Sequence, residues 1–344
     1  MQKKINIKTI ASDLGVSPST VSKALKDSHE ISEPTRERIK AYAKLHNYRP
    51  NRLAMSLRSQ KTYVIGIIIP EVVHHFFSRV LYGIESFAYE NNYSIMICLS
   101  KDNLQKEIQN IEMLTNGNVD GLLISVAKET LEKEEYSHFN QLIQQNFPIV
   151  FLDRVPQGLE IDKVIIDEVS GGYKAAQHLI EKGCKKIAIL TTSTHINVNK
   201  NREVGFFKAL EEYNFPLVNS YNIKVDEIYE EKEKYYLEQQ IEVLFDEKDR
   251  PDGIFAINEI YAAIALNIAH KRGLRVPEDI AIIGFTDGII SKTTNPALST
   301  IAQHGYTMGA QAVEILLERI ANKNLNKPYK TNVISTNVVE RGST

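Results

Sequence analysis

The sequence predicts an α/β protein: a small all-α N-terminal headpiece with a short hinge helix, then a two-lobed body of two doubly wound parallel sheets. In the first 60 residues the apolar side chains have helical spacing only. From Tyr63 onward, strand-like apolar runs alternate with amphipathic helices, a pattern typical of βαβ units and therefore of parallel sheets. The charge of the chain also changes sign at this boundary.

Charge is unevenly distributed along the 344 residues, whose formal net charge is −2. Residues 1–61 contain 13 Lys and Arg but only 5 Asp and Glu, a net charge of +8, and the remainder carries −10. A short basic segment on an acidic body indicates a polyanionic partner for the N-terminal segment alone. A solvated basic face without a partner would explain the charge equally well.

Composition favours a soluble protein of a reducing compartment. A hydrophobic fraction of 43% is enough for large buried cores. Cys98 and Cys184 each lie in an apolar run, which indicates buried thiols rather than a disulfide framework. The N-terminus has no apolar signal segment, and no stretch approaches the roughly 18 apolar residues of a membrane helix. We therefore expect a cytoplasmic protein that does not contact membranes.

Cap residues delimit three helices in the headpiece, residues 1–49. Asn6 is a suitable N-cap for IKTIASDL, and Gly15 follows that helix as a C-terminal glycine. Ser17 caps the second helix, with Pro18 at the first helical position, where its missing N–H costs nothing. Ser32 caps a third helix.

The first two helices have helix-turn-helix patterning. They meet at residues 15–17, where Ala11 is small enough for close approach and Ile10 and Val21 supply apolar contacts. The second helix should present polar side chains to base edges in the major groove. These DNA-binding candidates are Ser17, Pro18, Ser19, Thr20, Ser22 and Lys23. On spacing alone, a generic three-helix bundle remains the alternative.

Residues 50–62 predict a hinge helix followed by a polar linker. Pro50 breaks the chain, and Asn51 can cap a short helix that carries Leu53, Ala54 and Leu57. This segment is too short and too polar to be a stable helix by itself.

The body, residues 63–344, contains eight predicted strands, whose near-continuous apolar character indicates that both sheet faces are covered. The strands are 64–70, 93–100, 121–126, 148–153, 163–167, 186–192, 253–258 and 280–285. The helices between them include 76–91, 103–116, 137–146, 170–183, 200–213, 233–247 and 259–273. About 280 residues is large for one sheet. We expect lobe 1 to comprise 63–162 and 292–325, and lobe 2 to comprise 163–291 and 326–344.

These segments together resemble the LacI/GalR family of bacterial transcriptional regulators over essentially the whole chain. The matching pieces are IKTIASDLGVSPSTVSKAL, ISEPTRERIKAYAKLHNYRPNRLAMSLRS, VIGIIIPEVVHHFFSRVLYGIE, VDGLLIS, PIVFLDR, GFTDG and PALSTIAQ. The resemblance implies a homodimer that places two headpieces on a pseudo-palindromic, double-stranded operator, in association with the nucleoid. It also implies a hinge helix that folds in the minor groove, where Leu57 would wedge between base pairs. The hinge candidates for DNA binding are Asn51, Arg52, Ala54, Leu57 and Arg58.

The base-reading positions of the family fall at Pro18, Ser19 and Lys23, and the proline departs from common patterns. Proline has no donor and would pack only against a thymine methyl. The operator sequence therefore does not follow from this helix. The chain ends at NVVERGST without the leucine-rich tail of tetrameric relatives, so we expect a dimer.

The body resembles periplasmic sugar-binding proteins, in which the ligand lies between two lobes. Ligands of open parallel sheets bind beyond the carboxyl ends of the strands. The effector-binding candidates are His75, Phe76, Phe77, Ser125, Asp153, Thr192, Arg202, Asn258, Asp287 and Gln303. Arg202 matches the family arginine that binds polar ligand groups, and its planar donor fork suits paired oxygens. Phe76 and Phe77 are suited to stacking on a ring. The alternatives are a surface salt bridge for Arg202 and core packing for at least one phenylalanine.

Two departures from the family pattern concern this site. The family commonly has Asn-Pro where this chain has His74-His75, and two acidic residues where it has Thr286-Asp287. The loss of an acceptor at Thr286 changes how ligand hydroxyls are matched. Adjacent histidines without a third ligand at suitable spacing do not make a metal site, so we expect no metal and no cofactor.

The sequence therefore predicts a DNA-binding regulator, most simply a repressor, whose operator affinity depends on a sugar or sugar derivative bound between the lobes. A purine, a nucleoside or a partner protein is the alternative effector. A solute-binding protein would share the body but would need a signal peptide and no headpiece. An enzyme is disfavoured because GxGxxG, GxxxxGK[ST] and GxSxG are absent from the sequence.

Overall fold

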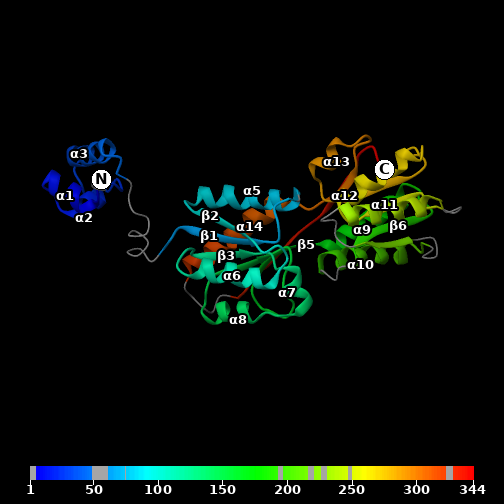
Figure 1. The fold of residues 1–344 in the computed structure, drawn as a ribbon, viewed down its shortest axis with the longest axis horizontal. Coiled ribbons are helices and arrows are strands. Elements are labelled where there is room, and N and C mark those ends of the chain that lie inside the picture. Colours follow the sequence, from blue (N-terminus) through cyan, green and yellow to red (C-terminus); the bar gives the residue numbers. More distant parts are fainter. Residues whose placement is uncertain are drawn as a thin grey trace. The chain divides into compact units, whose positions relative to one another are not determined.

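The computed structural model describes residues 5–48, 61–73, 75–192, 197–215, 221–225, 231–246, 250–322 and 328–344. The chain divides into two compact units, residues 1–62 and 63–344. The first unit is all-α in its described part, and the second contains two sheets with helices around them (Figure 1). Each sheet has six described strands. The predicted α/β class is confirmed. None of the described helices is long and apolar enough to cross a membrane.

The headpiece helices begin where the cap residues predict, and the first ends at the predicted glycine. They are α1 (Ile7–Leu14), α2 (Pro18–Ala24) and α3 (Glu33–Leu45). Asn6 Oδ1 accepts from the backbone N–H of Thr9 at 3.0 Å, and Ser17 Oγ accepts from that of Thr20 at 3.1 Å. Gly15 has φ 64°, the left-handed conformation that ends α1. Ser32 occupies the N-cap position of α3 without a side-chain bond to the helix backbone.

A small apolar core joins the three helices. Its buried members are Ile10, Ala11, Val21, Ala24, Ile39 and Ala43. The predicted contacts of the helix-turn-helix therefore form in the folded unit. The predicted hinge helix lies outside the described residues.

The first sheet of the body is parallel throughout, with the strand order β11-β5-β4-β3-β1-β2. Its strands are β1 (Val64–Ile69), β2 (Ser94–Leu99), β3 (Gly121–Ile124), β4 (Ile149–Leu152), β5 (Asp162–Ile166) and β11 (Thr331–Ile334). Helices cover both faces. They are α5 (His75–Glu90), α6 (Leu104–Thr115), α7 (Lys128–Lys133), α8 (Ser137–Gln144) and α14 (Gly305–Ala321).

The second sheet has the order β12-β10-β9-β8-β6-β7 and is parallel except for β12 against β10. Its strands are β6 (Ile187–Thr192), β7 (Tyr221–Val225), β8 (Gly253–Ala256), β9 (Ala281–Phe285), β10 (Ser299–Ala302) and β12 (Asn337–Val339). The accompanying helices are α9 (Glu168–Glu181), α10 (Asn197–Glu212), α11 (Glu231–Asp246), α12 (Glu259–Lys271) and α13 (Ile289–Thr293). Apolar clusters lie on both faces of this sheet too.

Three strands belong to the opposite lobe from the one expected. Residues from 163 were assigned to lobe 2, yet β5 pairs with β4 in the first sheet. Segment 292–325 was assigned to lobe 1, yet β10 pairs with β9 in the second sheet. The tail from 326 was assigned to lobe 2, yet β11 pairs with β5. Sheet membership is decided by which strands pair, and a local strand pattern does not reveal the pairing partner.

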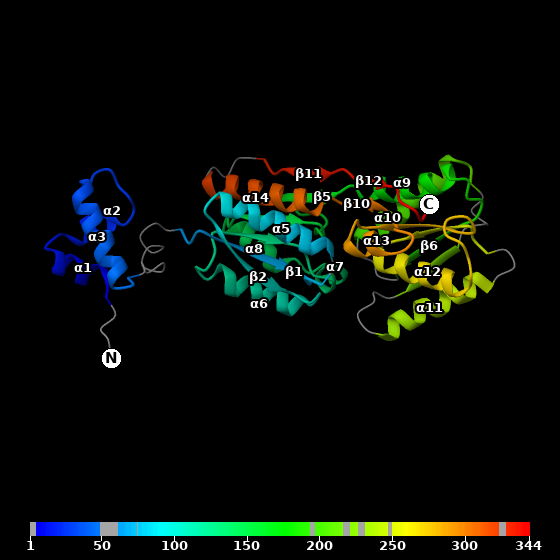
Figure 2. The same ribbon diagram turned by 90° about the horizontal axis from the view of Figure 1, so that it is seen from above.

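The chain consequently passes between the lobes three times within its described part, after β5, after β10 and after β11. Figure 2 shows the last of these passages as β11 leads into β12. All three passages connect strand ends near the boundary of the two sheets. They are the natural hinge for any movement of one lobe relative to the other.

Each lobe contains a pair of helices in contact through glycine. A Cβ placed on Gly172 of α9 would lie 2.0 Å from the backbone oxygen of Arg202 in α10. A Cβ placed on Gly309 of α14 would lie 2.1 Å from the backbone oxygen of Val80 in α5. Figures 1 and 2 show α5 and α14 running alongside one another. These close crossings fix the helix ends that carry site residues.

Candidate functional site

The start of α2 presents the predicted DNA-binding side chains. Four of the six are exposed (Ser17, Pro18, Ser19 and Lys23), and Thr20 and Ser22 are half-buried. Ser17 Oγ lies 2.7 Å from Ser19 Oγ and 2.8 Å from Thr20 Oγ1, so the hydroxyls form one cluster at the helix N-terminus. Such a cluster can exchange its internal bonds for phosphate or base edges. The hinge candidates Asn51, Arg52, Ala54, Leu57 and Arg58 lie outside the described residues.

Lys23 is paired with an acidic residue of its own headpiece. Its Nζ donates to Glu30, and this bond lowers the pKa of the Glu30 carboxyl. Both side chains are about half exposed. Because water surrounds the pair, it contributes little stability and can open when Lys23 meets DNA.

A cavity of about 630 Å³ lies in the body and contains eight of the ten predicted effector-binding residues. These eight are His75, Phe76, Phe77, Asp153, Thr192, Arg202, Asn258 and Gln303. Its volume is in the range usual for small-molecule sites. We call this space the main cavity.

The main cavity is lined from both lobes, at the carboxyl ends of their parallel strands. His75–Ser78 follow β1 and Asp153 follows β4 of the first sheet. Thr192 ends β6, Asn258 follows β8, and Thr286 and Gln303 follow β9 and β10 of the second sheet. In doubly wound sheets, ligands bind in the crevice at the carboxyl ends of the strands, where the strand order reverses.

Arg202 is held in a buried ion pair and not in a surface salt bridge. Its side chain is 6% exposed; Nε and Nη2 donate to the two carboxylate oxygens of Glu168 at 2.6 and 3.0 Å. Nη1 donates to the carbonyl oxygen of Ile257 at 2.8 Å, and the guanidinium lies 3.9 Å from the ring centre of Phe285. Of the five N–H groups of arginine, two remain without a partner among the described residues.

Asp153 supplies an acceptor to the main cavity. It lies directly after β4 with φ 59°, and its carboxylate accepts no hydrogen bond within the described ranges. Burial raises the pKa of Asp153 to about 6, although the charges of Arg154 and Arg202 act to lower it. A carboxylate that is desolvated without a hydrogen-bond donor is ready to accept bonds from a ligand.

Two side-chain amides have their oxygens engaged and their NH₂ groups left as donors. Asn258 Oδ1 caps α12 by accepting from the N–H of Tyr261 at 2.8 Å. Gln303 Oε1 accepts from Thr286 Oγ1 at 2.6 Å. These bonds fix the orientation of each amide. The two NH₂ groups are then left as donors for a ligand in the main cavity, to which Asp153 contributes an acceptor.

The two phenylalanines have different surroundings. Phe77 is 5% exposed and belongs to the core between α5 and the first sheet, as the core-packing alternative predicts. Phe76 is half-buried, with its ring centre 5.3 Å from that of Phe77 in an edge-on arrangement. Phe76 is therefore the ring more available to a ligand.

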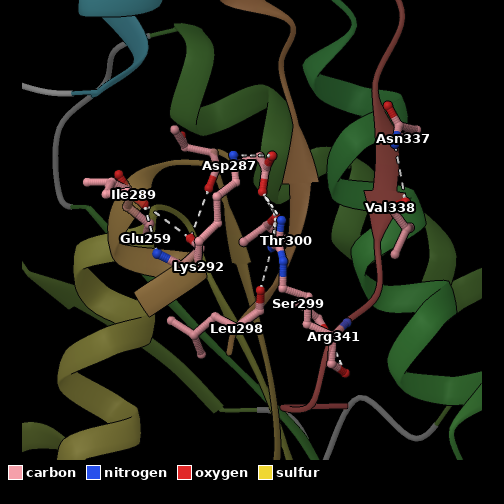
Figure 3. A network of polar contacts seen from close by, with 12 residues as sticks. Glu259, Asp287, Ile289, Lys292, Leu298, Ser299, Thr300, Asn337, Val338 and Arg341 are labelled. Atoms are coloured by element: carbon pink, nitrogen blue, oxygen red, sulfur yellow. Dashed lines mark hydrogen bonds and ion pairs between the residues drawn. The ribbon is translucent and has the colours of Figure 1, made fainter. Parts of the chain in front are cut away.

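Ser125 and Asp287 do not line the main cavity. Ser125 is fully buried, and its hydroxyl has no partner in the described part of the chain. Asp287 instead accepts hydrogen bonds from Arg341, in the C-terminal tail, and from Thr300 at 3.2 Å, and pairs with Lys292 at 3.1 Å, as Figure 3 shows. Partial burial acts to raise the pKa of Asp287, but the hydrogen bonds from Arg341 and Lys292 outweigh it and lower that pKa.

Several lining residues were not predicted. Glu259 lies beside Asn258 in sequence, and its carboxylate accepts from Ser291 Oγ at 3.1 Å. Asn199 precedes Arg202 by three residues, so one helix face carries both, and helical spacing alone would have shown this. His74 lies outside the described residues, and among the described ones no group of three His, Cys, Asp or Glu is arranged to hold a metal ion.

Comparisons with known proteins place this architecture in a family. The description "Bacterial regulatory proteins, lacI family" matches residues 6–51, and "Periplasmic binding protein-like domain" matches residues 176–344. The HTH-type transcriptional repressor PurR of Aliivibrio salmonicida is 33% identical over 319 residues, which cover 92% of this chain and 93% of that protein.

Solved structures of the same fold are also similar. The lac repressor dimer bound to operator and the anti-inducer ONPF matches with a TM-score of 0.84 at 24% identity, over 99% of each chain. A LacI family regulator from Enterococcus faecium with bound ribose matches with a TM-score of 0.69 at 26% identity, over 82% of this chain and 98% of that one. The resemblance noted in the sequence is confirmed: the chain belongs to the lacI family of bacterial regulatory proteins and is a DNA-binding transcriptional repressor, not an enzyme.

Proposed function

We propose that the main cavity binds a sugar or sugar derivative as the effector that sets operator affinity. The observation that carries the proposal is the convergence of an unpaired carboxylate, several oriented donors and an aromatic ring from two lobes on one cavity. A ligand that touches both lobes binds one of their arrangements better than another, and only such differential affinity shifts a conformational equilibrium.

The chemistry of the lining matches a polyhydroxylated ring. Each hydroxyl both donates and accepts, so it can donate to Asp153 while accepting from the amides of Asn258 or Gln303. The remaining N–H groups of Arg202 suit adjacent ligand oxygens. Phe76 offers a flat apolar surface for the carbon face of a ring. The ribose bound to the Enterococcus faecium regulator supports this class of ligand.

A purine or nucleoside is the second candidate effector. The curated relatives named PurR favour it, at 33% identity over most of the chain. Ring N–H groups would donate to Asp153, carbonyl oxygens would accept from Gln303, and the base would stack on Phe76. The same residues serve both candidates, so binding data must separate them.

For the DNA, we propose that the hydroxyl cluster of α2 and Lys23 contact the major groove, with Leu57 and its neighbouring hinge residues in the minor groove. The net charge of +8 in residues 1–61 supports binding to phosphates. A lysine whose only described partner is the exposed Glu30 can reach guanine O6 or N7.

We further propose a homodimer that uses the first lobe. The strand β2 is the edge of its sheet, and Met96 and Ile97 on it are 40% and 42% exposed. Tyr89 on α5 and Met113 on α6 are also exposed. An apolar strand edge of this kind is a natural pairing surface. A second copy would cover it, and the two headpieces would then match a pseudo-palindromic operator.

The effector proposal is tested by a thermal-shift screen of the full chain against sugars, sugar acids, purines and nucleosides. A ligand at about 100 times its Kd adds roughly 2.7 kcal/mol to the free energy of unfolding. We expect a stabilising sugar in wild type and no stabilisation in Asp153→Asn. Ser125→Ala is the matched control, because Ser125 was a candidate but lies outside the lining. If a purine is the sole stabilising ligand, the effector is the second candidate and not a sugar. If the ligand stabilises Asp153→Asn and Ser125→Ala equally, the effector binds outside the main cavity.

A further inference from the structure

A second space adjoins the main cavity, and we call it the side cavity. It has a volume of about 480 Å³ and lies between the N-terminal ends of α5 and α14 on one lobe and the loop after β9 with β12 on the other. The two cavities share lining residues: His75, Phe76, Thr286 and Gln303. One ligand can therefore contact both.

The side cavity is lined by two cationic side chains and one carboxylate, whereas the main cavity offers the carboxylates of Asp153 and Glu259. Arg79 and Lys292 line the side cavity, and Asp287 is the one carboxylate among the described lining residues. Asp287 already accepts from Lys292 and from Arg341 behind it, so two cations surround one anion. Arg79 is exposed and has no described carboxylate partner; its guanidinium lies 5.3 Å from the ring centre of Tyr82.

The N-terminus of the 17-residue helix α14 also opens into this space. His304 occupies the N-cap position with φ 54° and makes no capping hydrogen bond to the helix. Gly305, Tyr306 and Thr307 line the side cavity. The first backbone N–H groups of a helix have no partner within it, and the helix dipole places partial positive charge there. An anion next to these groups is stabilised.

Gln303 gives an independent indication of a ligand. Its side chain is only 4% exposed, and its Oε1 is held by Thr286, while its NH₂ group has no partner within the described part of the chain. The NH₂ group therefore remains available to donate to an acceptor in the cavity that it lines. Because Gln303 lines both cavities, a ligand that passes from one to the other would supply the missing acceptor.

We propose that the side cavity binds a phosphate group carried by the effector whose ring lies in the main cavity. This inference rests on the proposed function, and it narrows the effector to a phosphorylated sugar or, for the second candidate, a nucleotide. Arg79, Lys292, the N-terminal N–H groups of α14 and the amide of Gln303 would donate to the phosphate oxygens. Charge-assisted bonds of this kind are the stronger hydrogen bonds in proteins.

Inorganic phosphate tests the side cavity without knowledge of the effector. The thermal stability of the full chain is measured in phosphate and in chloride of equal ionic strength, for wild type, Arg79→Gln, Lys292→Gln and the control Lys208→Gln. Lys208 is an exposed lysine of α10 paired with Glu212, so its replacement removes the same charge away from both cavities. We expect phosphate to stabilise wild type and the control, with roughly tenfold weaker binding in Arg79→Gln, as the loss of one charged hydrogen bond predicts. No stabilisation of wild type, or equal stabilisation of all four proteins, overturns the proposal.

Matched ligand pairs test whether the effector carries the phosphate. Ribose is compared with ribose 5-phosphate, glucose with glucose 6-phosphate, and adenosine with its 5′-monophosphate. We expect one phosphorylated member to bind at least tenfold more tightly than its parent, an advantage that Arg79→Gln removes and Lys208→Gln keeps. If the unphosphorylated compounds bind as tightly as their phosphorylated forms, this inference is overturned and the proposed function stands. Binding of inorganic phosphate without binding of any pair contradicts the proposed effector, and the side cavity would then take a free anion.

Discussion

Asp153 combines an unusual environment with a position in the main cavity, and its titration has two consequences. In unfolded chains an aspartate has a pKa of about 3.9, whereas burial raises the pKa of Asp153 to about 6. Between these values the folded protein binds more protons than the unfolded chain. The free energy of unfolding therefore decreases as pH rises from about 4 to about 6, by at most about 3 kcal/mol.

The pH dependence of ligand binding follows from the same carboxylate. A ligand that donates hydrogen bonds to the ionised form should bind more tightly as pH rises through about 6. Asp153→Asn should show no binding at any pH between about 4 and about 8, and its ligand-free form should be more stable than wild type at pH 8. Calorimetric titrations and urea unfolding from about pH 4 to about pH 8 measure both effects. A wild-type affinity that is flat across this range would show that the ligand does not use the Asp153 carboxylate.

The places of residues at the main cavity were predicted well where they depend on position after a strand, and less well where they depend on a distant partner; their roles in binding stay predictions. Asp153, Asn258 and Gln303 line the main cavity because parallel strands bring their carboxyl ends to one edge. Asp287 has the same kind of position, but Arg341 binds it from 54 residues away. The sequence also did not predict the pairing of Arg202 with Glu168, because no local pattern links the two helices that carry them.

At the scale of elements, the crossing of α9 and α10 positions Arg202. The helices touch at Gly172 and at Gly205, where a Cβ would lie 1.9 Å from the backbone oxygen of Val169. No side chain can relax to admit an added methyl group, because the opposing atoms belong to the backbone. The helices must separate, and Arg202 must move relative to Glu168.

Gly172→Ala should therefore destabilise the protein by about 1–3 kcal/mol, as overpacking of a tight contact does, and weaken ligand binding. Glu181→Ala, an exposed position of the same helix, is the control and should change stability by less than about 0.5 kcal/mol. Urea unfolding and the thermal-shift response to the stabilising ligand measure these effects. Unchanged stability and binding in Gly172→Ala would mean that the helix crossing does not position the site.

Local signals predicted the elements themselves. Asn6, Gly15 and Ser17 delimit the headpiece helices because caps act within one turn of the chain. The eight predicted strands of the body all form, and the sheets also contain β7, β10, β11 and β12, which are not among those eight. The assignment of β5, β10 and β11 to lobes was wrong because sheet membership depends on the pairing partner, which a local pattern does not reveal. That partner is β4 for β5, β9 for β10 and the distant β5 for β11.

At the scale of the whole molecule, the two cavities lie where a ligand can influence the lobes. The chain passes between the sheets three times in its described part, and residues of both lobes line both cavities. Effector binding and operator binding are then linked by a coupling free energy that is reciprocal between the two sites. The direction of that coupling, release or recruitment, depends on which lobe arrangement the ligand prefers.

The most direct test is operator affinity measured by fluorescence anisotropy at fixed salt, with and without a saturating concentration of the ligand that stabilises the protein. The operator is obtained by selection from random DNA with the full chain. We predict that the ligand changes the Kd for operator by roughly 5- to 150-fold in wild type, and that Asp153→Asn abolishes the change while it keeps its affinity for DNA. An operator affinity that stays the same at saturating ligand would contradict the account, because the cavity would then bind without regulating.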